Sequence, residues 1–256
     1  MIHIKSLRKT YQKVQNNGKK STLHALDQVD FEIKSNRIYA IVGESGSGKS
    51  TLGKIISGLE SHDEGCLYYK GDLVRNKSFF YRKNIRQNIQ LVQQDTYSAL
   101  NPKMTIYQCV LEPIKNFRRL TSEEEKRLVY KLLDLVELDE SVMFKRPNQL
   151  SGGQQKRVNI ARAIACEPEL LILDEATSGL DVVVKKKILD LLKKIQNEKN
   201  CSILMITHDI DVAMYMSHHI SVMKDGKILE QVNFENDLSC FNHAYSNVLI
   251  ESTFLG

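Results

Sequence analysis

The sequence has few of the features that mark membrane, secreted or metal-binding proteins. No apolar run in its 256 residues approaches the roughly 18 that a membrane-spanning helix needs, so we expect no membrane span. The opening stretch, MIHIKSLRKTYQ, lacks the apolar core of a secretory signal, and we expect no such signal. The five cysteines are scattered without metal-ligand spacing, which indicates reduced thiols in a cytosolic protein.

A strong excess of one charge is also missing. The net charge is +5, and the lysines at 185–187 are typical of a solvated helix face rather than of a nucleic-acid surface. We therefore expect no nucleic-acid partner. Hydrophobic residues at 42% and charged residues at 26% are ordinary for a soluble globular protein. The length suits one α/β domain, with room for a subdomain.

Strand and helix patterns alternate in the first part of the chain. IHIKSLRKTYQ and LHALDQVDFEI alternate apolar and polar residues, which predicts two strands, and the polar stretch QNNGKKST between them predicts a loop. RIYAIVG is a short apolar run that ends at Gly43 and predicts a buried strand. STLGKIISGL predicts a helix whose apolar face holds Leu52, Ile55, Ile56 and Leu59.

The middle of the chain changes to helical patterns. Residues 84–165 predict a helical insertion, in which TSEEEKRLVYKLLDLVEL begins with a capping-box pattern from Ser122 to Glu125. The apolar face of this helix holds Leu128, Leu132, Leu135 and Val136. Two apolar strands follow, LLILDE and SILMITHD, with the helix VVVKKKILDLLKKIQNEKN between them. This β-α-β alternation predicts a parallel sheet.

The segment GESGSGKST, from Gly43 to Thr51, fits the pattern of a phosphate-binding loop. It lies between a predicted strand and a predicted helix, as the mechanism of such a loop requires. Its glycines let the backbone wrap a phosphate chain with N–H groups pointing inward. Lys49 can reach the β and γ phosphates, and the Ser50 hydroxyl can contact Mg²⁺. The pattern predicts a nucleotide-binding protein.

Polar residues follow two of the predicted core strands. Asp174 and Glu175 end LLILDE, and His208 follows the next strand. Ligands of open α/β sheets bind at the carboxyl ends of the strands. Asp174 would hold Mg²⁺ through water, Glu175 would polarise the water that attacks the γ-phosphate, and His208 would contact that phosphate. The alternatives are a solvated carboxylate pair and an ordinary surface or core histidine.

A second glycine-rich turn, LSGGQQ at residues 150–155, leads into another predicted helix. Such turns favour anions because backbone N–H groups and the helix dipole both attract them. The chain thus carries two candidate anion-binding turns but only one set of the strand-end residues Asp174, Glu175 and His208. Tyr11 is a further candidate, since its ring can stack on a base, although an aromatic residue in an N-terminal strand is as often part of the core.

In this order, GESGSGKST, LSGGQQ, LLILDEATSGLD and ITHD resemble the ATP-binding cassette (ABC) family of transporter ATPases, over essentially the whole chain. The resemblance implies an α/β fold: a P-loop NTPase (RecA-like) core with a mainly parallel sheet and an N-terminal antiparallel β subdomain. The helical subdomain at 84–165 would be inserted in one domain, 1–256, with a short tail at 232–256. It also implies a head-to-tail dimer, in which each ATP lies between the phosphate loop of one chain and the LSGGQQ turn of the other.

The resemblance implies a role for each motif. Tyr11 matches the aromatic residue that stacks on adenine, and Gln94 matches the glutamine that senses Mg²⁺ and links to the membrane domain. The residues from Ser151 to Gln154 match the family signature, and Ser178–Asp181 matches the loop that communicates across the dimer. His208 matches the switch histidine.

Together these matches and the motif chemistry give the expected site. The expected cofactors are ATP and Mg²⁺. The expected catalytic residues are Glu175, His208 and Gln94. The expected Mg²⁺ ligands are Ser50, Gln94 and Asp174. The expected ATP contacts are Tyr11, Gly43, Ser45, Gly46, Gly48, Lys49, Ser50, Thr51, Ser151, Gly152, Gly153, Gln154 and Asp181.

A finer resemblance is to the oligopeptide, dipeptide and nickel importers. YSALNPKMTI follows Gln94 as it does there, and HAYSNVL near the C-terminus is similar to a degenerate form of their tail motif, but the chain departs from the group at Gln93, Thr96, Ala244 and Ser246. This resemblance implies the ATPase subunit of an importer for nickel, a metal chelate or a peptide. An exporter subunit is the alternative. A soluble ABC ATPase without a transport role fits less well, because such proteins usually carry two cassettes or a long coiled-coil insertion.

The expected partners follow from the same resemblance. They are separate membrane subunits, a second cassette that is identical or a sibling, and, indirectly, an extracytoplasmic substrate-binding protein. The chain would lie on the cytoplasmic face of the cell membrane as a peripheral subunit. Within the stretch from Gln94 to Pro102, Tyr97 and Leu100 are candidates for docking a helix of the membrane partner.

Overall fold

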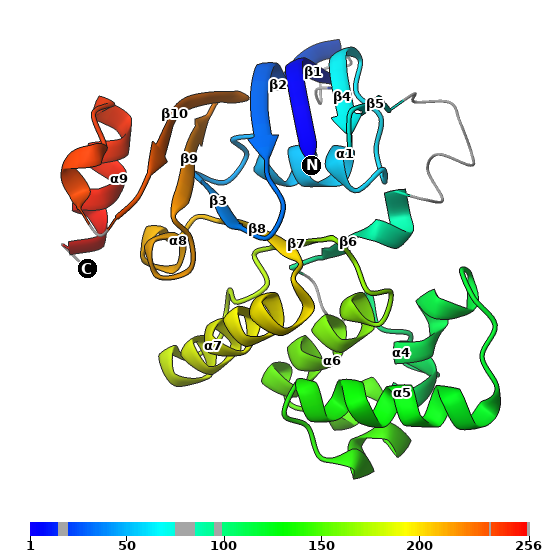
Figure 1. Cartoon of the computed structure of the whole chain (residues 1–256). Coiled ribbons are helices and arrows are strands. Elements are labelled where there is room, and N and C mark those ends of the chain that lie inside the picture. The colour runs from blue at the N-terminus through cyan, green and yellow to red at the C-terminus, as the bar shows by residue number, and fades with distance from the viewer. Residues whose placement is uncertain (15–19, 75–84, 95–98, 236, 255–256) are drawn as a thin grey trace. The chain divides into compact units, whose positions relative to one another are not determined.

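The computed structural model describes residues 1–14, 20–74, 85–94, 99–235 and 237–254 (Figure 1). The chain divides into two compact units. Unit 1 comprises Met1–Arg86 and Ser202–Gly256, and unit 2 comprises Gln87–Cys201. Unit 2 therefore contains most of the expected helical segment together with the strand and helix that follow it.

Unit 1 begins with an antiparallel sheet in the strand order β2–β1–β4–β5. Its strands are β1 (Ile2–Val14), β2 (Lys20–Ile33), β4 (Glu64–Tyr69) and β5 (Asp72–Leu73). Ile2 pairs with Ile33 and Ile4 with Phe31, and all four side chains are buried, because alternate residues of a strand face the same side. The two strands predicted from this alternation are confirmed.

A second group of strands in unit 1 is mainly parallel. Strand β3 (Ile38–Val42) pairs in parallel with β8 (Ser202–Thr207) and β9 (His219–Lys224), and β10 (Lys227–Asn233) runs antiparallel to β9. Every residue of β8 is buried, as expected for a strand of a parallel sheet that is covered on both faces. The carboxyl ends of β3 and β8 therefore lie side by side at one edge of the sheet.

The helical elements of unit 1 include α1 (Lys49–Ile56), α8 (Ile210–Met216), the 3₁₀ turn η3 (Leu238–Cys240) and α9 (Ala244–Phe254). Leu52, Ile55 and Ile56 are buried on α1 as predicted. Leu59 is 51% exposed, so its prediction as a core residue is wrong. The cause is local: the helix ends at Ile56, and Gly58 turns the chain away with φ 70°.

Unit 2 contains a parallel strand pair and several helices (Figure 1). The strands are β6 (Ile89–Val92) and β7 (Leu170–Asp174). The helical elements are α4 (Ile106–Lys115), α5 (Ser122–Leu135), η1 (Glu140–Phe144), η2 (Pro147–Gln149), α6 (Gly152–Ile164) and α7 (Val182–Lys199). On α5 and just after it, Leu132, Leu135 and Val136 are buried as predicted, and Leu128 is half-buried.

The start of α5 differs by one residue from the predicted capping box. Thr121, not Ser122, is the N-cap: its hydroxyl accepts a hydrogen bond from the Glu124 N–H at 3.3 Å, and the Glu124 carboxylate accepts from the Thr121 N–H at 2.7 Å. Both spacings fit the capping-box pattern. The structure has the earlier one, and the Glu125 carboxylate instead accepts a hydrogen bond from the Tyr107 hydroxyl at 3.1 Å.

The α/β fold class is confirmed by the antiparallel N-terminal sheet and the mainly parallel strand pairs. Among the residues that the structure describes, no helix is both long and apolar enough to cross a membrane.

Candidate functional site

The phosphate loop connects β3 to α1 without an intervening residue of regular structure. Gly48 is the N-cap of α1 and has a left-handed backbone with φ 105°. A usual N-cap such as Ser or Asp offers a side-chain oxygen to the first N–H groups of its helix, and a glycine has none to offer. The start of α1 is therefore built to receive an external anion, which the partial positive charge of a helix N-terminus attracts.

Packing requires glycine at two positions of the loop, and the backbone conformation favours it at a third. A Cβ at Gly43, where φ is 153°, would lie 2.0 Å from the Met223 carbonyl oxygen. A Cβ at Gly48 would lie 2.2 Å from the Ala25 carbonyl oxygen. Gly46 has φ 84°, but a Cβ there would meet no atom of the described residues within 4 Å. Packing thus excludes side chains at Gly43 and Gly48, while the backbone conformation alone favours glycine at Gly46.

Lys49 holds the loop in shape from inside. Its side chain is 4% exposed, and its Nζ donates to the carbonyl oxygens of Gly43 and Glu44, both at 2.7 Å. The same ammonium lies 3.2 Å from the Ser47 hydroxyl oxygen. These bonds join the first and last parts of the loop. A phosphate chain would offer this ammonium charged acceptors, which form stronger hydrogen bonds than neutral carbonyls do.

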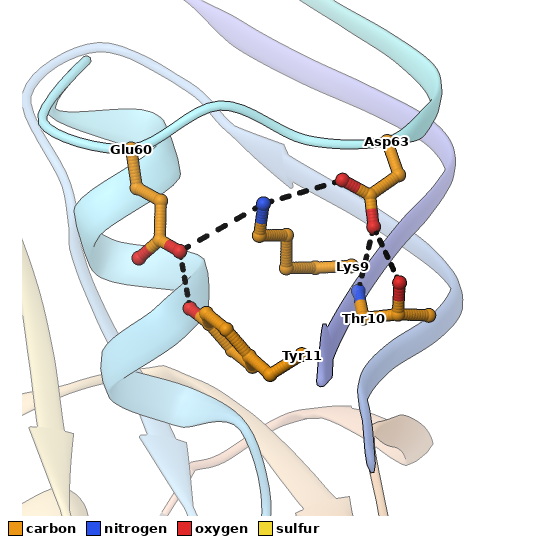
Figure 2. Close-up of polar contacts among 5 residues, drawn as sticks. All are labelled: Lys9, Thr10, Tyr11, Glu60 and Asp63. Atoms are coloured by element: carbon orange, nitrogen blue, oxygen red, sulfur yellow. Dashed lines mark hydrogen bonds and ion pairs between the residues drawn. The ribbon is translucent and has the colours of Figure 1, made fainter. Parts of the chain in front are cut away.

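Tyr11 belongs to a polar network between β1 and the segment that follows α1. Its hydroxyl donates to the Glu60 carboxylate, and Lys9 Nζ lies 3.9 Å from the same carboxylate (Figure 2). Lys9 also pairs with Asp63 at 3.2 Å, and Thr10 donates its N–H and its hydroxyl to Asp63 at 2.7 and 2.8 Å. The two carboxylates therefore fix the strand that carries Tyr11.

The Tyr11 ring is held at its hydroxyl end and on one face. Burial and the hydrogen bond to Glu60 raise the pKa of its phenol, against a smaller lowering by the Thr51 hydroxyl, so it stays a protonated donor at neutral pH. Lys9 Nζ lies 5.4 Å from the ring centroid, within cation–π range. Sequence analysis missed Glu60, because no local pattern links residues that lie 49 positions apart.

The other unit 1 residues that are expected at the ATP site lie at or after the carboxyl ends of β3 and β8. Thr207 of β8 pairs with Val42 of β3, so the residue before His208 neighbours the residue before the phosphate loop. His208 is exposed. Ser45, Gly46 and Ser50 are also exposed, and Thr51 is half-buried. Unit 1 therefore gathers the phosphate loop and His208 at one sheet edge, as the sequence predicts.

In unit 2, two neighbouring strand ends carry the expected carboxylates and glutamine. Asp174 ends β7 and is 7% exposed. Glu175 follows with φ 49°, a left-handed conformation that is uncommon for a residue with a side chain and typical of functional sites. Gln94 is exposed just beyond β6, whose Val92 pairs with Leu173 of β7.

The LSGGQQ turn is a capped helix start. The Ser151 hydroxyl accepts from the Gln154 N–H at 3.3 Å, and the Gln154 amide oxygen accepts from the Ser151 N–H at 3.0 Å. Gln155 is buried, and its Nε2 donates to the carbonyl oxygens of Pro147 and Leu150 at 3.0 and 3.1 Å. Sequence analysis missed this capping box, although Ser-x-x-Gln ahead of an apolar helix is its signal.

The two glycines of the LSGGQQ turn have different surroundings. Gly152 has no positive φ, and a Cβ there would meet no atom of the described residues within 4 Å. A Cβ at Gly153 would lie 3.1 Å from Cγ1 of Val184, in the first turn of α7. Asp181 caps that helix by accepting from the Val184 N–H at 2.9 Å. Unit 2 thus brings Gly153 close to the helix start that Asp181 caps.

Lys156 connects α6 to the loop after Glu175. Its Nζ donates to the Ser178 carbonyl oxygen at 2.6 Å, and the Ser178 hydroxyl donates to the Glu175 carbonyl oxygen at 2.8 Å. Burial lowers the pKa of Lys156, and the negative charge of Glu175 acts against that lowering. Sequence analysis missed Lys156 because a buried lysine is not marked by its neighbours in the sequence.

The predicted docking residues after Gln94 need a correction. Leu100 is 1% exposed, so it packs within unit 2 and does not offer a surface to a partner. Its apolar side chain belongs to the core, which a residue type alone does not reveal. Thr96 and Tyr97 lie outside the described residues.

Comparisons with known sequences give a family and its relatives. The family described as "ABC transporter" matches residues 26–178. The chain is 39% identical over 228 residues to the oligopeptide transport ATP-binding protein OppF of Lactococcus lactis subsp. lactis (strain IL1403), covering 89% of this chain and 72% of OppF. It is 40% identical over 230 residues to the nickel import ATP-binding protein NikE of Escherichia coli (strain K12), covering 90% of this chain and 86% of NikE.

Two solved structures are similar in both fold and sequence. One is a dimeric post-hydrolysis state of the ATP-binding cassette MJ0796 bound to ADP and Pi, with a TM-score of 0.82 and 34% identity, covering 93% of this chain and 100% of that one. The other is cbiO1 from Clostridium perfringens, part of the transporter complex cbiONQ, with a TM-score of 0.78 and 31% identity, covering 91% and 88%.

Proposed function

The chain belongs to the ABC transporter family and is an ATPase whose activity is coupled to transport, and from that premise we propose that it powers an importer for nickel, a metal chelate or a peptide. The predicted family and its P-loop fold are confirmed. The observation that carries the ATP-binding part of the proposal is the loop between β3 and α1, where Lys49 bridges two loop carbonyls next to a helix start that has no side-chain cap. The import part of the proposal rests on the relatives OppF and NikE.

The proposal divides the work on ATP between residues that bind the nucleotide and residues that act on the attacking water. Tyr11 stacks on adenine, and the phosphate loop with Lys49 holds the phosphates. Glu175 orients the attacking water, while His208 and Gln94 contact the γ-phosphate and the water. Support comes from the fixed Tyr11 ring, the exposed His208 and the left-handed Glu175.

Mg²⁺ fits the chemistry of the three residues that are expected to bind it. Mg²⁺ prefers hard oxygen ligands, and the Ser50 hydroxyl, the Asp174 carboxylate and the Gln94 amide oxygen are ligands of that kind. These three residues would hold the ion, which would supply positive charge to offset the negative charge that develops during phosphoryl transfer. Asp174 is nearly buried, which keeps its carboxylate in a fixed position.

The LSGGQQ turn, in this proposal, serves the nucleotide of a second cassette. Gly152 has an ordinary backbone and no neighbour within 4 Å among the described residues, so nothing in that part of the chain requires glycine there. A partner's phosphates approaching the helix start would require it. The MJ0796 cassette has been solved as a dimer bound to ADP and Pi, which supports dimerisation of this chain.

The proposed cargo and direction come from the named relatives, OppF for oligopeptides and NikE for nickel. The test is uptake of ⁶³Ni²⁺ and of a labelled short peptide by cells that lack this chain and are complemented with wild type or Glu175→Gln. Restored uptake of one substrate by wild type alone supports the proposal. If preloaded cells lost a substrate faster with wild type than with Glu175→Gln, the result would instead favour an exporter.

The proposed partners are membrane subunits, a second cassette and, indirectly, a substrate-binding protein, with the chain peripheral at the cytoplasmic face of the membrane. Affinity purification of the tagged chain from detergent-solubilised membranes tests this directly. The expected result is copurification with at least one polytopic membrane chain. Recovery of the chain only in the soluble fraction, bound to ribosomes or DNA, would contradict it.

A further inference from the structure

A tyrosine of the C-terminal segment reaches the phosphate loop. Tyr245 is the second residue of α9, and its side chain is 9% exposed. Its hydroxyl oxygen accepts a hydrogen bond from the backbone N–H of Glu44 at 3.4 Å. The two residues lie 201 positions apart, and both belong to unit 1. The HAYSNVL stretch therefore has a contact that nucleotide binding and dimerisation do not explain.

The backbone of Glu44 takes part in several of the hydrogen bonds that hold the loop. Its carbonyl oxygen accepts from Lys49 Nζ at 2.7 Å and from the Ser47 N–H at 3.2 Å. Its N–H is the group that Tyr245 engages. The carbonyl oxygen of Glu44 is thus held by the loop itself, and its N–H by the C-terminal helix. This arrangement fixes the peptide against which Lys49 is positioned.

Tyr245 is itself held in place by its surroundings. Lys224 Nζ, at the end of β9, lies 4.2 Å from the centroid of the Tyr245 ring, and the Tyr245 N–H donates to His243 Nδ1 at 3.1 Å. The carbonyl of Met223, next to Lys224, is the atom that excludes a side chain at Gly43. The end of β9 therefore contacts both the tyrosine and the loop.

Glu230 anchors the start of the C-terminal helix. Its carboxylate, on β10, accepts hydrogen bonds from the N–H groups of Asn242 and His243 at 2.7 and 3.1 Å and from the Ser246 hydroxyl. The Ser246 side chain is fully buried. The β9–β10 turn also supports the loop, since the Gly226 N–H donates to the Ser47 carbonyl oxygen at 2.9 Å.

We propose that Tyr245 is a positioning residue for the phosphate loop and that Glu230 holds Tyr245 in place. The proposal rests on the proposed ATP site and adds the C-terminal segment to it. Because the Glu44 peptide is fixed before nucleotide arrives, less conformational entropy is lost when the phosphates bind. Removing the contact lowers the affinity for ATP and for ADP by the same factor, because both nucleotides place phosphates in the loop.

The test compares Tyr245→Phe with wild type in the full-length chain. Phenylalanine keeps the buried ring over Lys224 and removes only the oxygen that Glu44 contacts. We expect hydrogen exchange at the Glu44 amide to accelerate by about two- to tenfold, and the Kd for ATP and for ADP to rise by about two- to tenfold, as for the loss of one neutral hydrogen bond. Glu230→Gln changes both quantities in the same direction.

Val248→Ala is the matched control, because Val248 lies on the same helix and is 60% exposed. It leaves exchange at Glu44 and nucleotide affinity at their wild-type values. Wild-type exchange at Glu44, or wild-type ATP affinity, in Tyr245→Phe would overturn the proposal. Lys49→Ala separates this failure from failure of the proposed function: if Lys49→Ala also bound ATP normally, the ATP site itself would be wrong.

Discussion

The phosphate loop and the LSGGQQ turn are both glycine-rich and both lead into a helix, but they are built differently. In the phosphate loop, the glycines adopt positive φ, and side chains at Gly43 and Gly48 would collide with backbone carbonyls. The helix that follows has no side-chain cap. In the LSGGQQ turn, Ser151 and Gln154 cap the helix reciprocally, and Gly152 has an ordinary backbone.

The two turns therefore use glycine for different reasons. The phosphate loop needs glycine for its own backbone conformation, and Lys49 holds the loop by donating to two of its carbonyl oxygens. The LSGGQQ turn completes its own hydrogen bonds and leaves open space at Gly152 among the described residues. The open space at Gly152, rather than the cap, is what leaves room for a ligand presented from outside the chain. Four predictions test this distinction, from the largest expected effect to the smallest.

Glu175→Gln slows ATP hydrolysis and leaves the phosphate loop and the LSGGQQ turn unchanged. We expect the ATPase rate of the assembled complex to fall by about 10²- to 10⁴-fold, because a positioned base contributes that much. ATP binding is unchanged, so an ATP-bound dimer accumulates, which size-exclusion chromatography with ATP detects. Glu140→Gln, at an exposed glutamate, is the control. Wild-type turnover in Glu175→Gln would remove this carboxylate from the mechanism.

Ser151→Arg blocks the LSGGQQ turn. ATP hydrolysis by the assembled complex is expected to fall by about a hundredfold or more, the cost of losing a preorganised contact to the reacting phosphate. ATP binding to the isolated chain stays nearly unchanged. Ser151→Ala is the control: it loses the cap, at about 0.5–2 kcal/mol of stability, without adding bulk. If Ser151→Arg weakened binding to the isolated chain, both turns would serve one intrachain site.

Lys49→Ala removes the ammonium that joins the phosphate loop. We expect ATP affinity of the isolated chain to fall about ten- to a hundredfold, since a charge-assisted hydrogen bond contributes about 1.5–3 kcal/mol. Isothermal titration calorimetry on the isolated chain measures this effect. Lys54→Ala, on the same helix, is the control and keeps wild-type affinity. An unchanged affinity in Lys49→Ala would contradict the proposed nucleotide site.

Gly43→Ala and Gly152→Ala compare the two turns by the same substitution. Gly43→Ala lowers the free energy of unfolding by at least about 1–2 kcal/mol, the cost of a left-handed alanine, because its Cβ also meets the Met223 carbonyl. Gly152→Ala changes the free energy by less than about 1 kcal/mol, in the stabilising direction. Chemical denaturation measures both. Equal losses would show that the two glycines share one structural role.

Much of the secondary structure followed from local sequence. Alternation and helical spacing predicted the strands around Tyr11 and the helices α1, α5 and α7, because periodicity reports which face is buried. Boundaries failed where two patterns competed. Thr121 and Ser122 both fit a capping box, and in the structure Thr121 is the cap while Glu125 contacts Tyr107. Leu59 fits the helix spacing but follows the helix end.

By itself, the sequence determined the parts of the site that are local in the chain. The phosphate loop, the carboxylates Asp174 and Glu175 and His208 each lie within or next to a strand, so a short pattern contains both the chemistry and its placement. Tertiary structure alone decided the contacts between distant residues. Glu60 binds Tyr11 from 49 positions away, and Tyr245 contacts Glu44 from 201. Such pairs form only where packed strands and helices bring side chains together, and their residue types are too common to reveal the pairing in advance.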